Sequence, residues 1–173
     1  MIKILVSSCL LGEPVRYHGG DAACDSGILQ RWREEGRIVS ACPETAAGLP
    51  VPRPPAEITG GDGSAVLARR AYVGDRSGAD VTDAFMRGAR ATLDLAVANG
   101  VRLAVLKDGS PSCATTYLHD GSFRNQRDAG KGVTAALLEQ AGIRLFNEHQ
   151  LEEAAAYAAS LEPGSGRGAK GKT

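Results

Sequence analysis

Short apolar runs alternate along the chain with amphipathic segments, and glycines or prolines separate them. The runs at residues 2–7, 37–41, 101–106 and 143–146 consist mainly of aliphatic and β-branched residues. Mainly apolar, β-prone runs of this length are typical of strands that are buried on both faces of a sheet. The pattern therefore predicts four buried strands.

Helical periodicity appears between these runs. Residues 26–35 place Ile28, Leu29 and Trp32 on one face and end at Gly36, and residues 133–140 and the alanine-rich residues 151–161 predict two more helices. Asp80 is a suitable N-cap for a long helix that ends at Gly100. Its apolar positions recur every four residues, at Val81, Phe85, Ala89, Leu93 and Val97.

One proline-rich segment shows neither the strand pattern nor the helix pattern. Residues 43–55 contain five prolines together with Gly48. Proline lacks a backbone donor and fixes φ, so this composition predicts a rigid, irregular loop without any regular element. A rigid loop that directly follows a strand is a suitable place for a functional site.

The alternation of strands and helices predicts a single-domain α/β fold, a parallel Rossmann-like sheet with helices on both faces, over residues 1–161. The last residues, 162–173, are basic and glycine-rich and have no apolar side chain that can anchor a core. They predict a disordered tail to which no function is assigned.

The length and net charge of the chain exclude some classes of function. The chain has 173 residues, and its 20 Lys and Arg residues balance 20 Asp and Glu residues. A net charge of zero provides no long-range attraction for polyanions, which argues against a dedicated DNA-binding protein. No stretch approaches the length of a membrane span and no cleavage pattern follows the first apolar run, so a cytosolic protein is expected.

Three of the four cysteines occupy equivalent positions. Cys9, Cys42 and Cys113 each follow the end of a predicted buried strand. The carboxyl ends of parallel strands lie along one edge of a sheet, where ligands bind, so the three thiols are expected to meet there. Any single free cysteine is most simply a small buried side chain, and that reading is kept for Cys24.

Three thiolates are soft ligands, which suit zinc with one further ligand or a 4Fe-4S cluster with one iron not bound by protein. A zinc-stabilised, non-enzymatic binding module would need a fourth ligand such as His18 or His119 and would make Glu44 dispensable. A nucleophilic cysteine is a weaker alternative, because no histidine lies near Cys42 or Cys113 in the sequence.

The chain contains eight short motifs, which are Ser8-Cys-Leu-Leu-Gly12, Arg16-Tyr17, Cys42-Pro-Glu44, Gly48-Leu-Pro50, Pro52-Arg-Pro-Pro-Ala-Glu57, Asp80-Val-Thr82, Ser110-Pro-Ser-Cys113 and Gly132-Val-Thr-Ala-Ala-Leu-Leu138. Together and in this order they resemble the thiouracil desulfidase family, and the resemblance spans about residues 2–148.

The resemblance implies a 4Fe-4S cluster on Cys9, Cys42 and Cys113, with Glu44 and Ser110 as catalytic residues. It also implies removal of sulfur from thiolated uracil derivatives, such as 4-thiouracil or its nucleotide, which yields the oxo form and sulfide without electron transfer. The expected partner is thus a small thiouracil or thionucleotide. DNA and membranes are not expected as partners, and thiolated RNA is disfavoured.

The residues themselves support some of these roles. Glu44 stands two residues from Cys42, where a carboxyl group can move protons. Ser110 can orient a water molecule, or it can simply cap its turn. For a substrate phosphate, candidate donors are Arg53 and the helix start at Lys131 and Gly132, although a structural salt bridge of Arg53, for example to Glu57, is an equal alternative.

Overall fold

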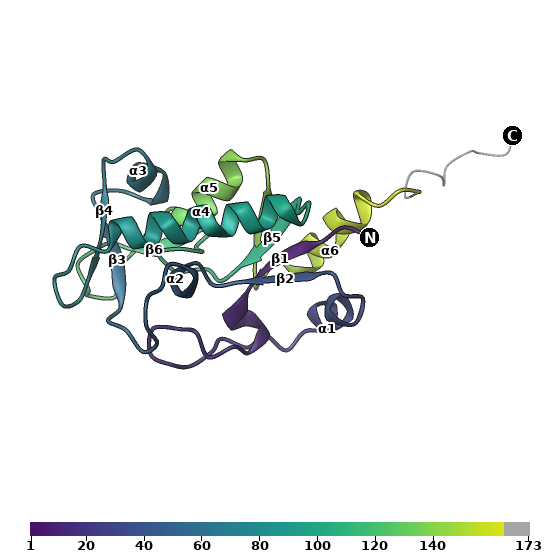
Figure 1. Cartoon of the computed structure of the whole chain (residues 1–173), viewed down its shortest axis with the longest axis horizontal. Helices are drawn as coiled ribbons and strands as arrows, with labels where there is room; N and C mark the ends of the chain where they lie inside the picture. The colour runs from purple at the N-terminus through teal and green to yellow at the C-terminus, as the bar shows by residue number, and fades with distance from the viewer. Residues whose placement is uncertain (165–173) are drawn as a thin grey trace, which may run out of the picture.

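Four parallel strands form the central sheet of the computed structural model, which describes residues 1–164 (Figure 1). Their order across the sheet is β2-β1-β5-β8. The strands are β1 (Ile4–Ser7), β2 (Ile38–Ala41), β5 (Leu103–Leu106) and β8 (Arg144–Asn147). The predicted α/β class and parallel sheet are confirmed, and each predicted strand is present within two residues of its expected bounds.

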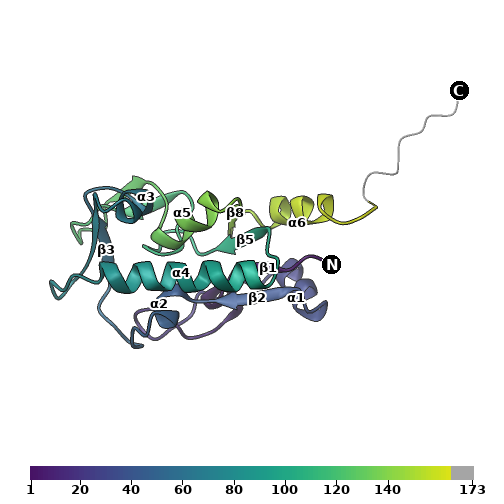
Figure 2. The same cartoon turned by 45° about the horizontal axis from the view of Figure 1, so that its top comes forward.

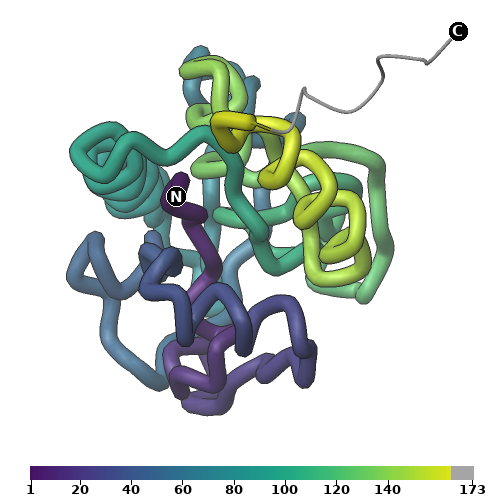
Figure 3. The backbone as a smooth tube through the Cα atoms, turned by 90° about the vertical axis from the view of Figure 1, so that its right-hand side faces the viewer, coloured from purple at the N-terminus to yellow at the C-terminus, as the bar shows by residue number. Residues whose placement is uncertain are grey.

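Helices cover both faces of this sheet, as predicted. Helices α1 (Gly27–Glu34) and α6 (Leu151–Ser160) pack on one face, and α4 (Thr82–Ala98) and α5 (Val133–Gln140) pack on the other. In Figure 3 the coils of α4 and α6 lie on opposite sides of the N-terminal strand. Because successive strand residues point to opposite faces, Ile4 and Val6 enter the α1/α6 core and Leu5 enters the α4/α5 core.

Helix α4 begins one residue later than predicted, because Val81 and not Asp80 is at its N-cap position. The Asp80 carboxylate still accepts a hydrogen bond from the Thr82 amide at 2.9 Å. The prediction that Val97 belongs to its buried face was wrong, because Val97 is 67% exposed. A strict repeat of four residues drifts around a helix of 3.6 residues per turn. The buried stripe consequently moves to Thr92 and Ala96 in the last turns.

The proline-rich segment is more ordered than predicted. Residues Pro43–Ala46 form a short helix, α2, in which the Ala46 and Ala47 amides donate to the carbonyls of Cys42 and Pro43. The expectation of no regular element was therefore wrong for its first turn. Proline lacks only a donor that is unused at the first helical position, so Pro43 begins a helix without penalty.

A second group of elements, which the sequence patterns did not predict, extends the fold at one end (Figures 1 and 2). Strands β3 (Ala56–Thr59) and β4 (Tyr72–Asp75) form an antiparallel pair around α3 (Gly63–Leu67), and β6 (Tyr117–His119) pairs with β7 (Arg127–Ala129). These strands have three or four residues and mixed polarity, too little for a periodic signal. Apolar side chains of β3, β4 and β6 share a third core with α4, whereas β7 is exposed.

The folded region continues slightly past the predicted boundary at residue 161. The Glu162 carboxylate accepts hydrogen bonds from the Ile2 amide at 3.0 Å and from Arg37 at 3.1 Å, so it ties the end of α6 to β1. The remainder of the predicted tail, residues 165–173, lies outside the described residues. Within residues 1–164 we find no helix that is both long and apolar enough to span a membrane.

Candidate active site

A cavity of about 470 Å³ opens at the carboxyl ends of β1, β2 and β5. The chain runs from β1 outward to β2 and then returns to β5 on the other side, which places the cavity where the strand order reverses. Ligands of open α/β sheets bind at such a point. Cys9, Cys42 and Cys113 all line this cavity, together with Glu44 and Ser110, whereas Cys24 does not.

Each cysteine is held by the element that follows its strand. Cys9 lies in a 3-10 turn, η1 (Ser8–Leu11), which Gly12 ends in the left-handed conformation at φ 91°. Cys42 immediately precedes α2. Cys113 is 6% exposed and lies in the irregular segment after β5. The fold therefore brings these three cysteines to one site, as the sequence predicted. Cys24 instead packs at the edge of the α1/α6 core.

Burial dominates the electrostatics of the thiols. Desolvation raises the pKa of Cys9 to about 11, and the positive charges of Arg16 and Lys107 offset only part of this effect. Desolvation also raises the pKa of Cys113, against a hydrogen bond with the Ser7 side chain that lowers it. These thiols have no protein cation strong enough to ionise them, and a bound metal centre is what would deprotonate them.

The donor set fits an iron-sulfur cluster better than zinc. Among residues 1–164, no three His, Cys, Asp or Glu side chains are close enough to share one metal ion. Cluster thiolates stand farther apart, because each binds a different iron. Of the suggested fourth zinc ligands, His119 lines the cavity, whereas the His18 ring accepts a hydrogen bond from the Gly20 amide and is not part of the lining. Three cysteine thiolates around an open cavity are the arrangement that a 4Fe-4S cluster requires.

The loop that carries Cys113 is organised by Asp108, which is 4% exposed. One carboxylate oxygen accepts hydrogen bonds from the amides of Gly109, Thr115 and Thr116 at 2.9–3.1 Å. The other accepts from the Thr116 hydroxyl and from Asn147 of β8. Sequence analysis missed this residue, although an Asp before Gly-Ser-Pro is a signal for a side chain that bonds its own turn.

Helix α5 also supports this loop. The amides of Val133 and Ala135 donate to the carbonyls of Pro111 and Ser112 at 2.9 and 3.1 Å. A Cβ at Gly132 would lie 2.4 Å from the Ser112 carbonyl carbon, so only glycine permits this approach. Neither Lys131 nor Gly132 lines the cavity, and Lys131 pairs with Glu139 at 3.4 Å. Their proposed role as phosphate donors stays a prediction that the position of the cavity does not support.

Glu44 is held by Arg53 in a largely buried salt bridge. The Arg53 Nε donates to Glu44 Oε1 at 3.0 Å, and their side chains are 5% and 16% exposed. The other two guanidinium nitrogens donate to the carbonyls of Pro50 and Val15. The expected structural salt bridge thus exists, but its partner is Glu44. Glu57, the suggested partner, instead accepts hydrogen bonds from the amides of Gly121 and Phe123.

Ser110 caps its turn, one of the two roles that the sequence left open, and its role in orienting a water molecule stays a prediction. Its hydroxyl oxygen accepts hydrogen bonds from the amides of Ser112 and Cys113 at 3.1 and 3.2 Å, which caps the turn. The residue also lines the cavity. Because the oxygen acts as the acceptor in both bonds, the hydroxyl proton remains available to a ligand.

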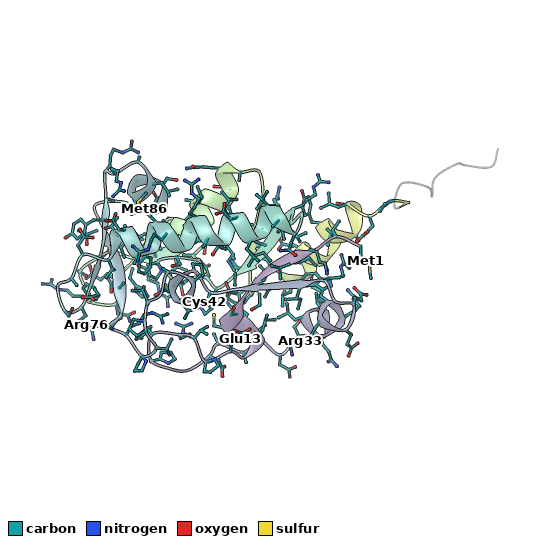
Figure 4. The ribbon with its side chains drawn as sticks, viewed as in Figure 1. Met1, Glu13, Arg33, Cys42, Arg76 and Met86 are labelled. Carbon is teal, nitrogen blue, oxygen red and sulfur yellow. The ribbon has the colours of Figure 1, made fainter. Side chains whose placement is uncertain are left out.

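The cavity wall contains further residues to which sequence analysis assigned no role. Arg16, Arg76 and Arg124 line it, and none of the three forms a salt bridge within residues 1–164. Arg76 lies over the Phe123 ring, 5.7 Å from its centre, at the end of the molecule formed by β3 and β4 (Figure 4). These arginines are far apart in sequence, so no local pattern brings them together.

Comparison with known proteins identifies the family. The sequence profile of the family described as 2-thiouracil desulfurase matches residues 4–150. Uncharacterized protein YbbK of Bacillus subtilis (strain 168) is 43% identical over 150 residues, 87% of this chain and 98% of that protein. The solved structure of 4Fe-4S-dependent thiouracil desulfidase TudS is 45% identical, with a TM-score of 0.85 over 93% of this chain and 100% of that one. The resemblance seen in the motifs is thereby confirmed: the chain belongs to the 2-thiouracil desulfurase family.

Proposed function

We propose that this protein is an iron-sulfur-dependent desulfidase that converts thiolated uracil derivatives to their oxo forms and releases sulfide without net electron transfer. Cys9, Cys42 and Cys113 would hold a 4Fe-4S cluster. The observation that carries the proposal is the meeting of these three cysteines with Glu44 and Ser110 in one cavity. The name of the solved relative, a 4Fe-4S-dependent thiouracil desulfidase, supports the same cofactor and substrate class.

Three cysteines leave one iron of a cluster without a protein ligand, and that iron supplies a soft Lewis acid that polarises a thiocarbonyl group when the cluster is bound. The protein residues then have two tasks, which are to orient the thiolated ring and to manage the protons of the attacking water. Ser110 serves the first task, since its hydroxyl can donate to a ring oxygen or nitrogen.

Glu44 serves the second task. Arg53 binds its Oε1, while its Oε2 accepts no hydrogen bond within residues 1–164. The free oxygen can take a proton from the water that attacks the ring carbon and return it to the leaving sulfur. Because Arg53 is itself fixed by two backbone carbonyls, the carboxylate keeps its orientation while the proton moves.

The arginines of the wall favour a charged substrate. Arg16, Arg76 and Arg124 present three guanidinium groups to the cavity without a salt-bridge partner in the described part of the chain. A planar guanidinium group binds phosphate with paired hydrogen bonds. A thiouracil nucleotide, with its ring toward the cysteines and its phosphate toward these arginines, therefore suits the cavity better than the free base.

The decisive experiment is anaerobic reconstitution, followed by iron and sulfide analysis. Loss of the thiocarbonyl absorbance of 4-thiouracil and of 4-thiouridine monophosphate is then recorded together with sulfide release. Four irons per chain and equal amounts of oxo product and sulfide are expected, with a higher kcat/KM for the nucleotide. A protein that binds zinc in place of iron and leaves both substrates intact contradicts the proposal.

A further inference from the structure

A chain of three side chains connects the active-site cavity with the surface. The Ser8 and Ser40 hydroxyl oxygens are 2.6 Å apart, and the Ser40 hydroxyl donates to Glu13 Oε1 at 2.9 Å. Ser8 is 4% exposed and lines the cavity beside Cys9. Ser40, on β2, and Glu13 are exposed to solvent. The chain therefore leads from a buried hydroxyl to a solvated carboxylate.

The direction of these hydrogen bonds follows from counting protons. A serine hydroxyl has one proton, and that of Ser40 is donated to Glu13, which as a carboxylate can only accept. Ser40 must then accept in its contact with Ser8, so the Ser8 proton points toward Ser40. Both lone pairs of Ser8 then remain available to accept a proton. The chain is thus already oriented to move a proton outward.

A second opening in the protein lies along the same residues. A cavity of about 450 Å³ is lined by Ser8, Ser40 and Glu13, and it also contains Cys42. Ser8, Ala41 and Cys42 line both cavities. Figure 4 shows Glu13 and Cys42 close to one another near the ends of β1 and β2. Water can therefore reach the outer end of the chain without entering the substrate cavity.

The proposed reaction produces a proton that needs such a route. Water adds its oxygen to the ring carbon, the carbon–sulfur bond breaks with its electron pair on sulfur, and a carbon–oxygen double bond forms. One water proton passes through Glu44 to sulfur and gives hydrosulfide. The second is released as the carbonyl forms, so thiocarbonyl and water become carbonyl, hydrosulfide and one proton, and nothing is oxidised or reduced.

We infer that Ser8, Ser40 and Glu13 form a proton relay that carries this second proton from the active site to solvent. Ser8 accepts it while its own proton moves to Ser40, and the Ser40 proton moves to Glu13, which exchanges with bulk water. The inference rests on the proposed desulfidase function. It assigns a role to two side chains, those of Ser40 and Glu13, that do not line the substrate cavity.

The test uses the cluster-loaded protein in dilute buffer. Ser40→Ala removes the middle hydroxyl and is expected to lower kcat about tenfold, with iron content and KM unchanged. The loss is smaller than that expected for a general acid or base itself, because the relay assists only one proton transfer. Rising concentrations of imidazole, a small proton acceptor that can enter the second cavity, should restore kcat. Ser40→Thr keeps the hydroxyl and should recover most of the lost rate. Ser64→Ala, at an exposed serine outside both cavities, is the matched control.

These measurements distinguish a failure of the proposed relay from a failure of the proposed desulfidase function. If wild-type protein with a full cluster turns over and Ser40→Ala matches its kcat at every imidazole concentration, the relay is wrong and the desulfidase function stands. If the wild-type protein carries four irons and does not release sulfide from either substrate, the proposed function fails and the relay fails with it. A rate loss in Ser40→Ala that imidazole does not restore and Ser40→Thr does not correct also overturns the relay.

Discussion

Burial makes ionisation unfavourable for two of the three cavity cysteines, Cys9 and Cys113. The pKa of Cys9 is raised to about 11 by desolvation, and the pKa of Cys113 is raised further by the same cause. Buried thiols of this kind are poor nucleophiles at neutral pH, since the thiolate is the reactive species. Their position is better explained by metal ligation than by nucleophilic attack.

Replacing Cys9, Cys42 or Cys113 with Ala is therefore expected to abolish cluster retention, because a cluster that loses one of three protein ligands is held by two. Iron and sulfide analysis after anaerobic gel filtration measures this. Cys24→Ala is the matched control, since Cys24 does not line the cavity, and it should retain four irons. Equal iron loss in Cys24→Ala would contradict the assignment.

Glu44→Gln preserves size and hydrogen bonding but cannot carry a proton. We expect cluster content to be unchanged and kcat to fall by a factor of about 10²–10⁴, the usual range for loss of a general acid–base. Single-turnover absorbance of a thiouracil nucleotide checks this. Glu139→Gln, at an exposed carboxylate on α5, should keep the wild-type kcat. Full activity in Glu44→Gln would assign proton transfer to another group.

Asp108 links pH to the stability of the cysteine loop. Burial alone would raise its pKa, but hydrogen bonds from the Thr116 hydroxyl and from the amides of Thr116, Thr115 and Gly109 outweigh that effect and lower it. A carboxyl group with a lowered native pKa stabilises the fold fully above its unfolded pKa, and this contribution is lost as the pH falls through the native pKa.

Asp108→Asn should consequently lower the free energy of unfolding by about 1–3 kcal/mol at pH 7, because the amide leaves donors without acceptors. The difference from the wild-type protein should be constant from pH 7 to about 5 and should narrow below about pH 4, as Asp108 becomes protonated. Urea unfolding across this pH range provides the measurement. A difference that grows toward acid pH would show that the carboxylate does not stabilise the loop.

At the scale of elements, glycine decides how closely the helix that carries Glu44 can approach α4. A Cβ at Gly88 of α4 would lie 2.0 Å from the Pro43 carbonyl oxygen and 3.3 Å from the Ala47 Cβ. Helix α2 can pack against α4 only because Gly88 has no side chain. The position of Glu44, and of Cys42 just before α2, therefore depends on a residue that lines neither cavity.

Gly88→Ala is expected to destabilise the protein by about 1–3 kcal/mol, the usual cost of overpacking, and to reduce cluster retention because α2 must move. Thermal unfolding and iron analysis together test this. Gly27→Ala is the matched control, since Gly27 begins α1 and a Cβ there meets no atom within 4 Å. A Gly88→Ala protein as stable as Gly27→Ala would show that α2 adjusts at no cost.

Much at this scale was predictable, and the failures have physical causes. The bounds of α5 were predicted to the residue, since Gly132 and a compact apolar run define it. The short strands β3, β4, β6 and β7 were missed because strand pairing, together with the third core for β3, β4 and β6, stabilises them, and neither leaves a periodic pattern. Helix α2 was missed because the four later prolines of the segment obscured the favourable position of Pro43 at the start of the helix.

At the scale of the whole molecule, the cysteines join parts of the chain that lie far apart. Cys9, Cys42 and Cys113 follow three different strands, so a cluster that binds all three restrains the carboxyl edge of the sheet. A ligand that binds only the native state stabilises it by mass action. The cluster should thus be a stabilising element as well as a cofactor.

The cluster-free protein is therefore expected to unfold several degrees below the loaded protein in anaerobic calorimetry. Oxygen exposure, which destroys such clusters, should move the loaded protein to the lower temperature. In Cys42→Ala the two preparations should unfold together, because neither retains a cluster. Equal unfolding temperatures of loaded and cluster-free wild-type protein would show that the cluster does not connect the three strand ends.

The parallel sheet, its helices and the equivalent positions of three cysteines could be predicted from the amino-acid sequence alone, because apolar periodicity and helix-breaking residues are local properties. The sequence also carried the motifs of the family. The three-dimensional fold was needed to show that Arg53 binds Glu44, that Asp108 holds the cysteine loop and that Ser8, Ser40 and Glu13 form one hydrogen-bonded chain. Those contacts join residues from different elements, and their geometry depends on packing that no local pattern encodes.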